Sequence, residues 1–135
     1  MKKRIFLLLM LVLVSFGLSA CDDAKTQIML PAVSQLSAVE VTNEAGTETK
    51  IVTDTNWMTQ LFEELSKVEA TDQTSVQDVP VADVYWQIDF VFSEEGKTTA
   101  YLYEEEGKWY LEQPYVAVYQ APSSCAKFLQ QLWLT

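Results

Sequence analysis

One nine-residue run constrains the fold of this chain more than any other stretch. In residues 84–92 (VYWQIDFVF) every second side chain, beginning with Val84, is apolar. This period of two is typical of a β-strand with one face on a core. Turns containing glycine follow at residues 93–97 and 104–107, and they separate two further short runs. We therefore predict a three-stranded antiparallel meander as the central sheet.

The preceding segments predict a hairpin and a helix. Residues 36–41 and 47–52 alternate on either side of the turn sequence NEAG, which is typical of a β-hairpin. Residues 56–67 carry apolar side chains at helical spacing, after Thr and Asp side chains that can cap a helix N-terminus. Residues 69–83 show no periodicity. We interpret them as a long loop, either a binding loop or a plain solvated connection.

The last segments complete an α+β domain. Residues 115–119 predict a further edge strand, and residues 124–134 predict a closing helix with an apolar stripe. The expected fold is a mainly antiparallel four- to five-stranded sheet, formed by a β-hairpin, a helix and a three-stranded meander, and completed by a C-terminal helix. Two helices pack the sheet. The expected domain occupies residues 36–135.

The N-terminus has the pattern of an export signal. Cations at positions 2–4 precede an apolar run at 5–18, which is too short for a confident membrane span. The sequence Leu18-Ser19-Ala20-Cys21 resembles the lipobox of bacterial lipoproteins. The resemblance implies a signal peptide at 1–20, acylation of Cys21 and a lipidated tether at 21–35. An ordinary secreted or single-pass protein is the alternative.

Charge and cysteine content limit the partners. The precursor has nine Lys and Arg residues against nineteen Asp and Glu. Removal of the signal takes away three of the cations, for a net charge of about −13. Such a charge opposes binding to nucleic acid and to anionic lipid head groups. We therefore expect contact with the membrane through the lipid anchor alone. Cys125 has no internal disulfide partner once Cys21 is acylated, and we expect it to be buried.

The residue inventory excludes much catalytic chemistry. The chain has no histidine, no cysteine cluster and no glycine-rich phosphate loop, so no cofactor and no metal site are predicted. Carboxylate catalysis through Asp89 is a hypothesis, but we favour an Asp89 that faces water on the open side of the sheet. The acidic turn at 104–106, and Asp72 with Asp78, lack the regular spacing of a calcium loop.

Tyrosines form the candidate ligand site. If helices cover one face of the meander, Tyr85, Tyr101, Tyr103 and Tyr110 line the other. Tyrosine is enriched at recognition surfaces because it buries a large area and keeps a polar tip. These four residues are therefore candidates for binding an envelope protein, peptide or glycan. Cross-strand tyrosine pairing that only stabilises the sheet is the alternative.

Residues 107–115 (GKWYLEQPY), followed by an extended segment and a closing helix, are similar to an uncharacterised domain family of small lipoproteins in Gram-positive bacteria. The order of strands and helices from residue 36 onward also fits that family. The resemblance implies a lipid-anchored domain of unknown function on the extracytoplasmic face of the cell membrane, with no catalytic residues to transfer. We therefore expect a non-enzymatic binding or accessory lipoprotein. The alternatives are a module that masks or inhibits another protein, and a carboxylate-dependent hydrolase.

Overall fold

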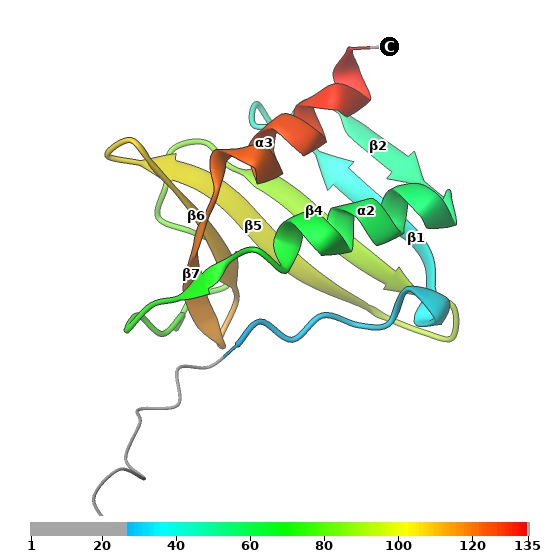
Figure 1. Cartoon of the computed structure of the whole chain (residues 1–135), viewed down its shortest axis with the longest axis horizontal. Helices are drawn as coiled ribbons and strands as arrows, with labels where there is room; N and C mark the ends of the chain where they lie inside the picture. The colour runs from blue at the N-terminus through cyan, green and yellow to red at the C-terminus, as the bar shows by residue number, and fades with distance from the viewer. Residues whose placement is uncertain (1–26, 135) are drawn as a thin grey trace, which may run out of the picture.

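A computed structural model describes residues 27–134, which form one sheet with helices on one side (Figure 1). The predicted signal peptide (1–20) and the predicted lipidation site Cys21 lie outside the described residues. The elements in chain order are η1 (Val33–Gln35), β1 (Leu36–Thr42), β2 (Thr49–Val52), α2 (Thr55–Leu65), β3 (Glu69–Ala70), β4 (Trp86–Phe92), β5 (Lys97–Glu105), β6 (Lys108–Gln113), β7 (Ala117–Ala121), α3 (Ser123–Gln130) and η2 (Gln131–Trp133).

The sheet has seven strands in the order β2-β1-β4-β5-β6-β7-β3, and every adjacent pair is antiparallel. The α+β class is confirmed, but the predicted count of four to five strands was wrong. The hairpin joins the meander through β1 and β4, so the two form one continuous sheet. Strand β3 has two residues, too few for a period to be visible in the sequence. Because β3 pairs with β7, the segment predicted as an edge strand is internal.

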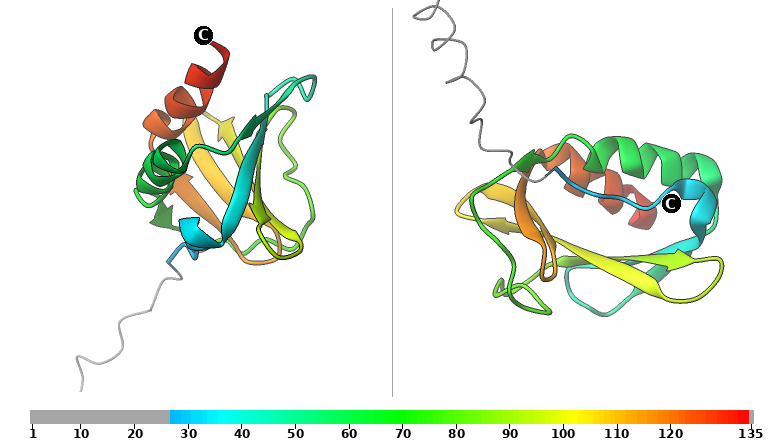
Figure 2. Two further views of the ribbon diagram at one scale, coloured as in Figure 1. Left: turned by 90° about the vertical axis from the view of Figure 1, so that its right-hand side faces the viewer. Right: turned by 90° about the horizontal axis from the view of Figure 1, so that it is seen from below.

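The core lies between the sheet and its two α-helices, which cover the same face (Figure 2). Asp54 begins α2 by accepting a 2.8 Å hydrogen bond from the Trp57 backbone N–H, a normal N-cap. The rings of Trp57 and Phe128 stack at 5.3 Å and join α2 to α3. The alternating apolar residues of β4 point into this layer, as the sequence predicts.

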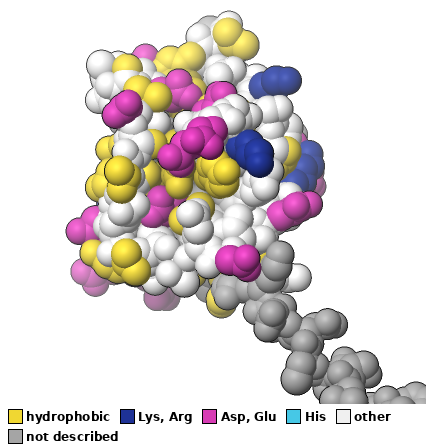
Figure 3. Space-filling view, turned by 90° about the vertical axis from the view of Figure 1, so that its left-hand side faces the viewer, with side chains coloured by type: hydrophobic (Ala, Val, Ile, Leu, Met, Phe, Trp, Pro, Cys, Tyr) yellow, Lys and Arg dark blue, Asp and Glu magenta, His cyan; other side chains and the backbone are white. Residues whose placement is uncertain are grey.

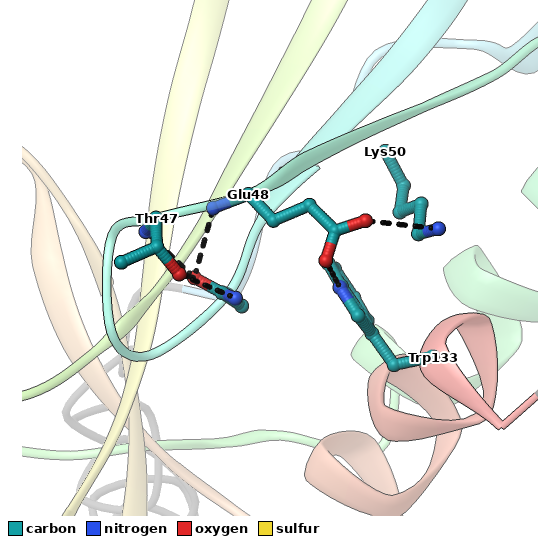
Figure 4. Close-up of polar contacts among 5 residues, drawn as sticks. Thr47, Glu48, Lys50 and Trp133 are labelled. Carbon is teal, nitrogen blue, oxygen red and sulfur yellow. Dashed lines mark hydrogen bonds and ion pairs between the residues drawn. The ribbon is translucent and has the colours of Figure 1, made fainter.

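The C-terminal 3₁₀ turn η2 makes a polar contact with the β1–β2 hairpin (Figure 4). The Trp133 indole donates a 2.8 Å hydrogen bond to Glu48 Oε2, and Lys50 Nζ lies 3.1 Å from Glu48 Oε1. Lys50 Nζ also lies 5.9 Å from the centre of the Trp133 ring. The 3₁₀ turn η2 is thereby joined to the β1–β2 hairpin.

The described part of the predicted tether runs along the domain (Figure 1). Ile28, Leu30 and Val33 are partly buried against the core. The Met29 carbonyl accepts a 3.0 Å hydrogen bond from Gln113 Nε2, and the Gln35 carbonyl accepts one of 2.9 Å from the Ser93 backbone. The chain therefore approaches the domain along the ends of β6 and β4.

The second face of the sheet is crossed by the long loop between β3 and β4 (residues 71–85, Figure 2). The backbone N–H of Val118 donates to the Gln73 carbonyl at 3.1 Å, and the Thr71 hydroxyl donates to the Val118 carbonyl. The helices thus cover one face of the sheet, and this loop packs on part of the other, where Ser75 and Gln77 bond to Glu112. None of the helices within residues 27–134 is both long and apolar enough to cross a bilayer.

Candidate binding groove

The four candidate tyrosines lie on the face of the sheet that the loop crosses, and they form two pairs. Tyr85 meets Tyr101 edge-on, with ring centres 5.2 Å apart. Tyr103 lies beside Tyr110 on the neighbouring strand, with ring centres 5.9 Å apart. These contacts are cross-strand and loop-to-strand pairings of aromatic rings, which stabilise a sheet.

The loop buries the two central rings. Tyr101 and Tyr103 are each only 7% exposed, while Tyr85 and Tyr110 are partly exposed. Burial raises the pKa of both central phenols, and the neighbouring Glu112 carboxylate raises that of Tyr103 further. The four rings therefore do not form an open face. Of the four, Tyr101 lines the groove described below.

A buried carboxylate on the sheet holds this loop through hydrogen bonds. Glu112 on β6 is 1% exposed, and its Oε1 accepts hydrogen bonds from Ser75 Oγ at 2.7 Å and Gln77 Nε2 at 3.1 Å. The Tyr103 hydroxyl donates to Oε2 at 3.3 Å. A buried carboxylate needs such donors, because charge without partners is costly in a protein interior. Glu112 is thus a structural anchor for residues 75–77.

Asp89 differs from the expectation. It is 3% exposed and does not face water. Its carboxylate accepts hydrogen bonds from the Thr99 hydroxyl and from Gln87 Nε2, and Lys97 Nζ lies 3.5 Å away. Strand alternation placed Asp89 on the correct face but did not reveal these neighbours. The carboxylate is fully engaged in structural contacts, and it does not line the groove.

The strongest candidate site is an apolar groove of about 750 Å³ beside the N-terminal part of β5. One wall is the N-terminal segment, with Leu30 and Pro31. The turn between β6 and β7 adds Pro114 and Val116 to the lining. Its floor comes from β4 and β5, through Phe90, Phe92, Thr98, Thr99 and Tyr101. A groove of this size with mostly apolar walls is typical of a ligand site.

Tyr115 forms the rim of the groove in a strained conformation. The β6–β7 turn closes through a 3.0 Å hydrogen bond from the Val116 N–H to the Gln113 carbonyl. Tyr115 follows Pro114 in this turn and has a φ of 60°, the position of a type II turn that normally requires glycine or asparagine. Tyr115 is 64% exposed. The Asp78 carboxylate raises the pKa of its phenol. The backbone N–H of Tyr115 donates to Ser75 Oγ at 3.3 Å, which ties the turn to the loop. Strain of this kind is typical of functional sites.

One polar atom in the groove lacks a partner. Gln113 Nε2 donates to the Met29 carbonyl, but Gln113 Oε1 is buried and accepts no hydrogen bond from any described residue. Buried acceptors are almost always paired in native proteins. Because this oxygen is shielded from solvent, a ligand donor reaches it only when the Gln113 amide turns toward the groove.

Other cavities are less suited to binding. A cavity of about 450 Å³ beneath the loop is lined by polar groups, including Asp72, Glu105 and Glu112. The Glu112 carboxylate there is already bonded to the loop. Within the part of the chain that the structure describes, no group of three or more acidic or cysteine side chains is arranged to hold a metal ion. Asp78 is the only carboxylate among the described residues that line the groove, and these residues therefore offer no facing pair of the kind that a carboxylate-dependent hydrolase requires.

Most of the groove residues carry no signal in the sequence that predicts a binding site. Met29, Leu30 and Pro31 fall within the segment 21–35, for which the sequence predicts a tether. One signal was available, because residues 107–115, which carry the family resemblance, end in Gln113-Pro114-Tyr115. These three residues line the groove.

Comparisons with known proteins agree with an uncharacterised domain. Residues 24–120 match the model of the family DUF5301, described as a domain of unknown function (DUF5300). The NMR structure of a protein from Ruminococcus gnavus is similar, with a TM-score of 0.61 and 28% identity over 70% of this chain and 91% of that one. A comparison with curated proteins finds no match. The prediction of an uncharacterised domain family is confirmed.

Proposed function

This chain belongs to the DUF5301 family of domains of unknown function, and we propose that it is a membrane-anchored lipoprotein that binds an envelope partner on the extracytoplasmic face of the cell membrane. The binding site is the groove beside the N-terminal part of β5. No catalytic step is part of the proposal. The observation that carries it is the apolar groove of about 750 Å³, whose rim residue Tyr115 is held in a strained conformation.

Two further observations support the proposal. The lipobox-like sequence ending at Cys21 predicts attachment to the membrane. The groove wall contains Leu30 and Pro31, a few residues after that cysteine. The binding site and the predicted anchor are thus close together in the chain.

Anchoring is tested by labelling cells with an alkyne-tagged fatty acid. The expected result is a labelled protein in the membrane fraction, and loss of both label and membrane association in Cys21→Ala. Cys125→Ala is the matched control and keeps the label, because this buried thiol is the only other cysteine in the chain. Labelled, membrane-bound Cys21→Ala would contradict the proposed anchor.

Binding is tested by site-specific photo-crosslinking in intact cells. A photoreactive amino acid at position 115 is expected to give a discrete adduct with an envelope component. The control position is Ile51 on β2, which is 67% exposed and does not line the groove. Absence of adducts at 115, or equal adducts at both positions, contradicts a binding role for the groove.

A further inference from the structure

Strand β5 has an open edge beside the groove. It pairs with β4 over residues 97–102, but its pairing with β6 begins only at Tyr101, opposite Glu112. Extending that register places Thr99 opposite Pro114, whose nitrogen carries no hydrogen. Strand β6 ends one residue earlier, at Gln113. Residues 97–100 of β5 therefore have a strand neighbour on one side only.

The backbone of Thr99 points toward this open edge. The Phe92 N–H donates to the Gly96 carbonyl at 3.0 Å at the start of the β4–β5 ladder. Hydrogen-bonded and non-hydrogen-bonded pairs alternate in antiparallel ladders, so Thr98 faces β4 and Thr99 faces away. The β5–β6 hairpin gives the same parity, because Glu105 and Lys108 flank its two-residue turn.

We propose that the groove binds an extended peptide segment of the partner, which adds to β5 as a new strand beside Thr99. This inference rests on the proposed binding function and specifies its ligand class. In strand addition, backbone hydrogen bonds supply affinity, and pockets for alternate side chains supply specificity. Here the Thr99 N–H and carbonyl supply the backbone hydrogen bonds, and the apolar groove supplies the side-chain pockets.

The groove fits such a strand in three ways. Every second side chain of the peptide points to the side of Phe90, Phe92 and Leu30, so apolar residues at those positions are favoured. When the peptide binds, the Gln113 amide turns toward the groove and its unpartnered Oε1 accepts a hydrogen bond from an N–H of the peptide. The exposed Tyr115 ring packs over the peptide from the rim, with a large apolar surface and a polar tip.

Charge selects a peptide with basic residues. Asp78 lines the groove. Glu94 and Glu95 line a smaller cavity of about 320 Å³ that shares Gln35 and Phe92 with it. Acidic side chains are also spread over the face seen in Figure 3, where basic side chains gather at one side. The ligand class is therefore an extended peptide with alternating apolar residues and flanking Lys or Arg.

The test selects peptides from a random phage-displayed library on the mature chain, residues 21–135. The proposal expects selected sequences that alternate apolar residues and carry flanking Lys or Arg. The best peptide is then titrated into the nitrogen-15-labelled chain. The expected result is slowed amide exchange at Thr99 and shifted signals at Gln113 and Thr98. Library selection without such sequences, or binding without protection of Thr99, overturns the proposal.

Three variants sharpen the result. Tyr115→Asn keeps a residue suited to a positive φ but removes the ring, and we expect at least a fivefold loss of peptide affinity. Ile51→Asn, the matched control on β2, leaves affinity unchanged. A peptide with proline at its central position is also expected to lose binding, because it cannot donate to β5. Unchanged binding of the proline peptide, or of Tyr115→Asn, overturns strand addition.

The outcome is separable from that of the proposed function. Crosslinks at position 115 without any Thr99-protecting peptide mean that the groove binds a partner in another way, so strand addition alone fails. Dimerisation of the mature chain that protects Thr99 identifies a second copy as the occupant and also overturns the proposal. Loss of all crosslinks at 115 contradicts the proposed function itself.

Discussion

Ser75 Oγ donates a 2.7 Å hydrogen bond to Glu112 Oε1 across 37 positions of the chain. Both side chains are buried, and the bond joins the long loop to the centre of the sheet. Ser75 Oγ also accepts a 3.3 Å hydrogen bond from the Tyr115 backbone N–H at the groove rim, and the same loop contributes Asp78 to the groove lining. The contact between Ser75 and Glu112 therefore positions one side of the groove without lining it.

Replacing Glu112 is expected to loosen the loop and destabilise the domain. Glu112→Ala leaves the Ser75 and Tyr103 hydroxyls without their acceptor, at a cost of about 3 kcal/mol in the free energy of unfolding. Urea denaturation measures this loss, and amide exchange is expected to quicken in residues 73–78. Glu105→Ala, an exposed acid on β5, is the control and changes stability by less than ~0.5 kcal/mol. Similar losses in both variants would contradict the anchoring role.

Cys125 is expected to be unreactive in the folded protein. It is 1% exposed, its thiol donates to the Glu64 carbonyl at 3.3 Å, and burial raises its pKa from 9.0 to about 11. Ionisation alone then gives about a hundredfold less thiolate at pH 8 than in an exposed cysteine. A thiol reagent measures the rate with and without urea. Equal rates in the two conditions contradict the prediction.

The same shift predicts a loss of stability at alkaline pH. A thiol whose pKa is higher in the folded state stays protonated while the unfolded chain ionises. The contribution of the Cys125 thiol to the free energy of unfolding is therefore complete below pH 9 and is lost as the pH rises toward 11. The urea midpoint is expected to fall over this range, and to fall less in Cys125→Ala. Buried tyrosines with a raised pKa, such as Tyr103, account for the fall in the urea midpoint that remains in Cys125→Ala.

Trp133 is expected to stabilise the closing turn. Trp133→Phe removes the hydrogen bond to Glu48 and weakens the edge contact with Trp86, whose ring lies 5.3 Å away. The expected cost is about 1 kcal/mol in thermal or urea unfolding, since the site is partly exposed. Leu134→Ala is the control with no expected effect, because Leu134 is exposed. An unchanged midpoint in Trp133→Phe would show that η2 is held by other contacts.

The β5–β6 turn offers a stabilising substitution. Glu106 and Gly107 have φ values of 51° and 78° and form the two-residue turn between Glu105 and Lys108, as in a type I′ turn. Asparagine followed by glycine is the preferred pair there, so Glu106→Asn is expected to raise the free energy of unfolding by about 0.5 kcal/mol. Gly107→Ala has free space around its added Cβ but a strained φ, and is expected to cost about 1 kcal/mol. Opposite signs in urea denaturation confirm the turn type.

Periodicity predicted the parts of the fold in which one face of an element is buried. The alternation of β4 and the stripe of α2 were sufficient to place Ile88 and Leu61 in the core. Strand β3 escaped prediction because two residues carry no period, and its pairing with β7 depends on contacts distant in sequence. The burial of Tyr101 and Asp89 escaped for a similar reason, since it depends on neighbours that alternation does not specify. The groove escaped because it joins two segments more than eighty positions apart, Met29 and Gln113.

The N-terminal segment sets how far the domain can move from its predicted anchor. The Gln27 carbonyl accepts a 3.4 Å hydrogen bond from the Tyr119 hydroxyl, and five residues lie between Cys21 and Gln27 in the sequence. Fully extended, they span no more than ~20 Å. If Cys21 carries the proposed lipid anchor, the groove stays near the membrane and meets a membrane-held partner at an effective concentration on the order of millimolar. A dissociation constant on the order of tens of micromolar for the free peptide therefore gives nearly full occupancy at the membrane.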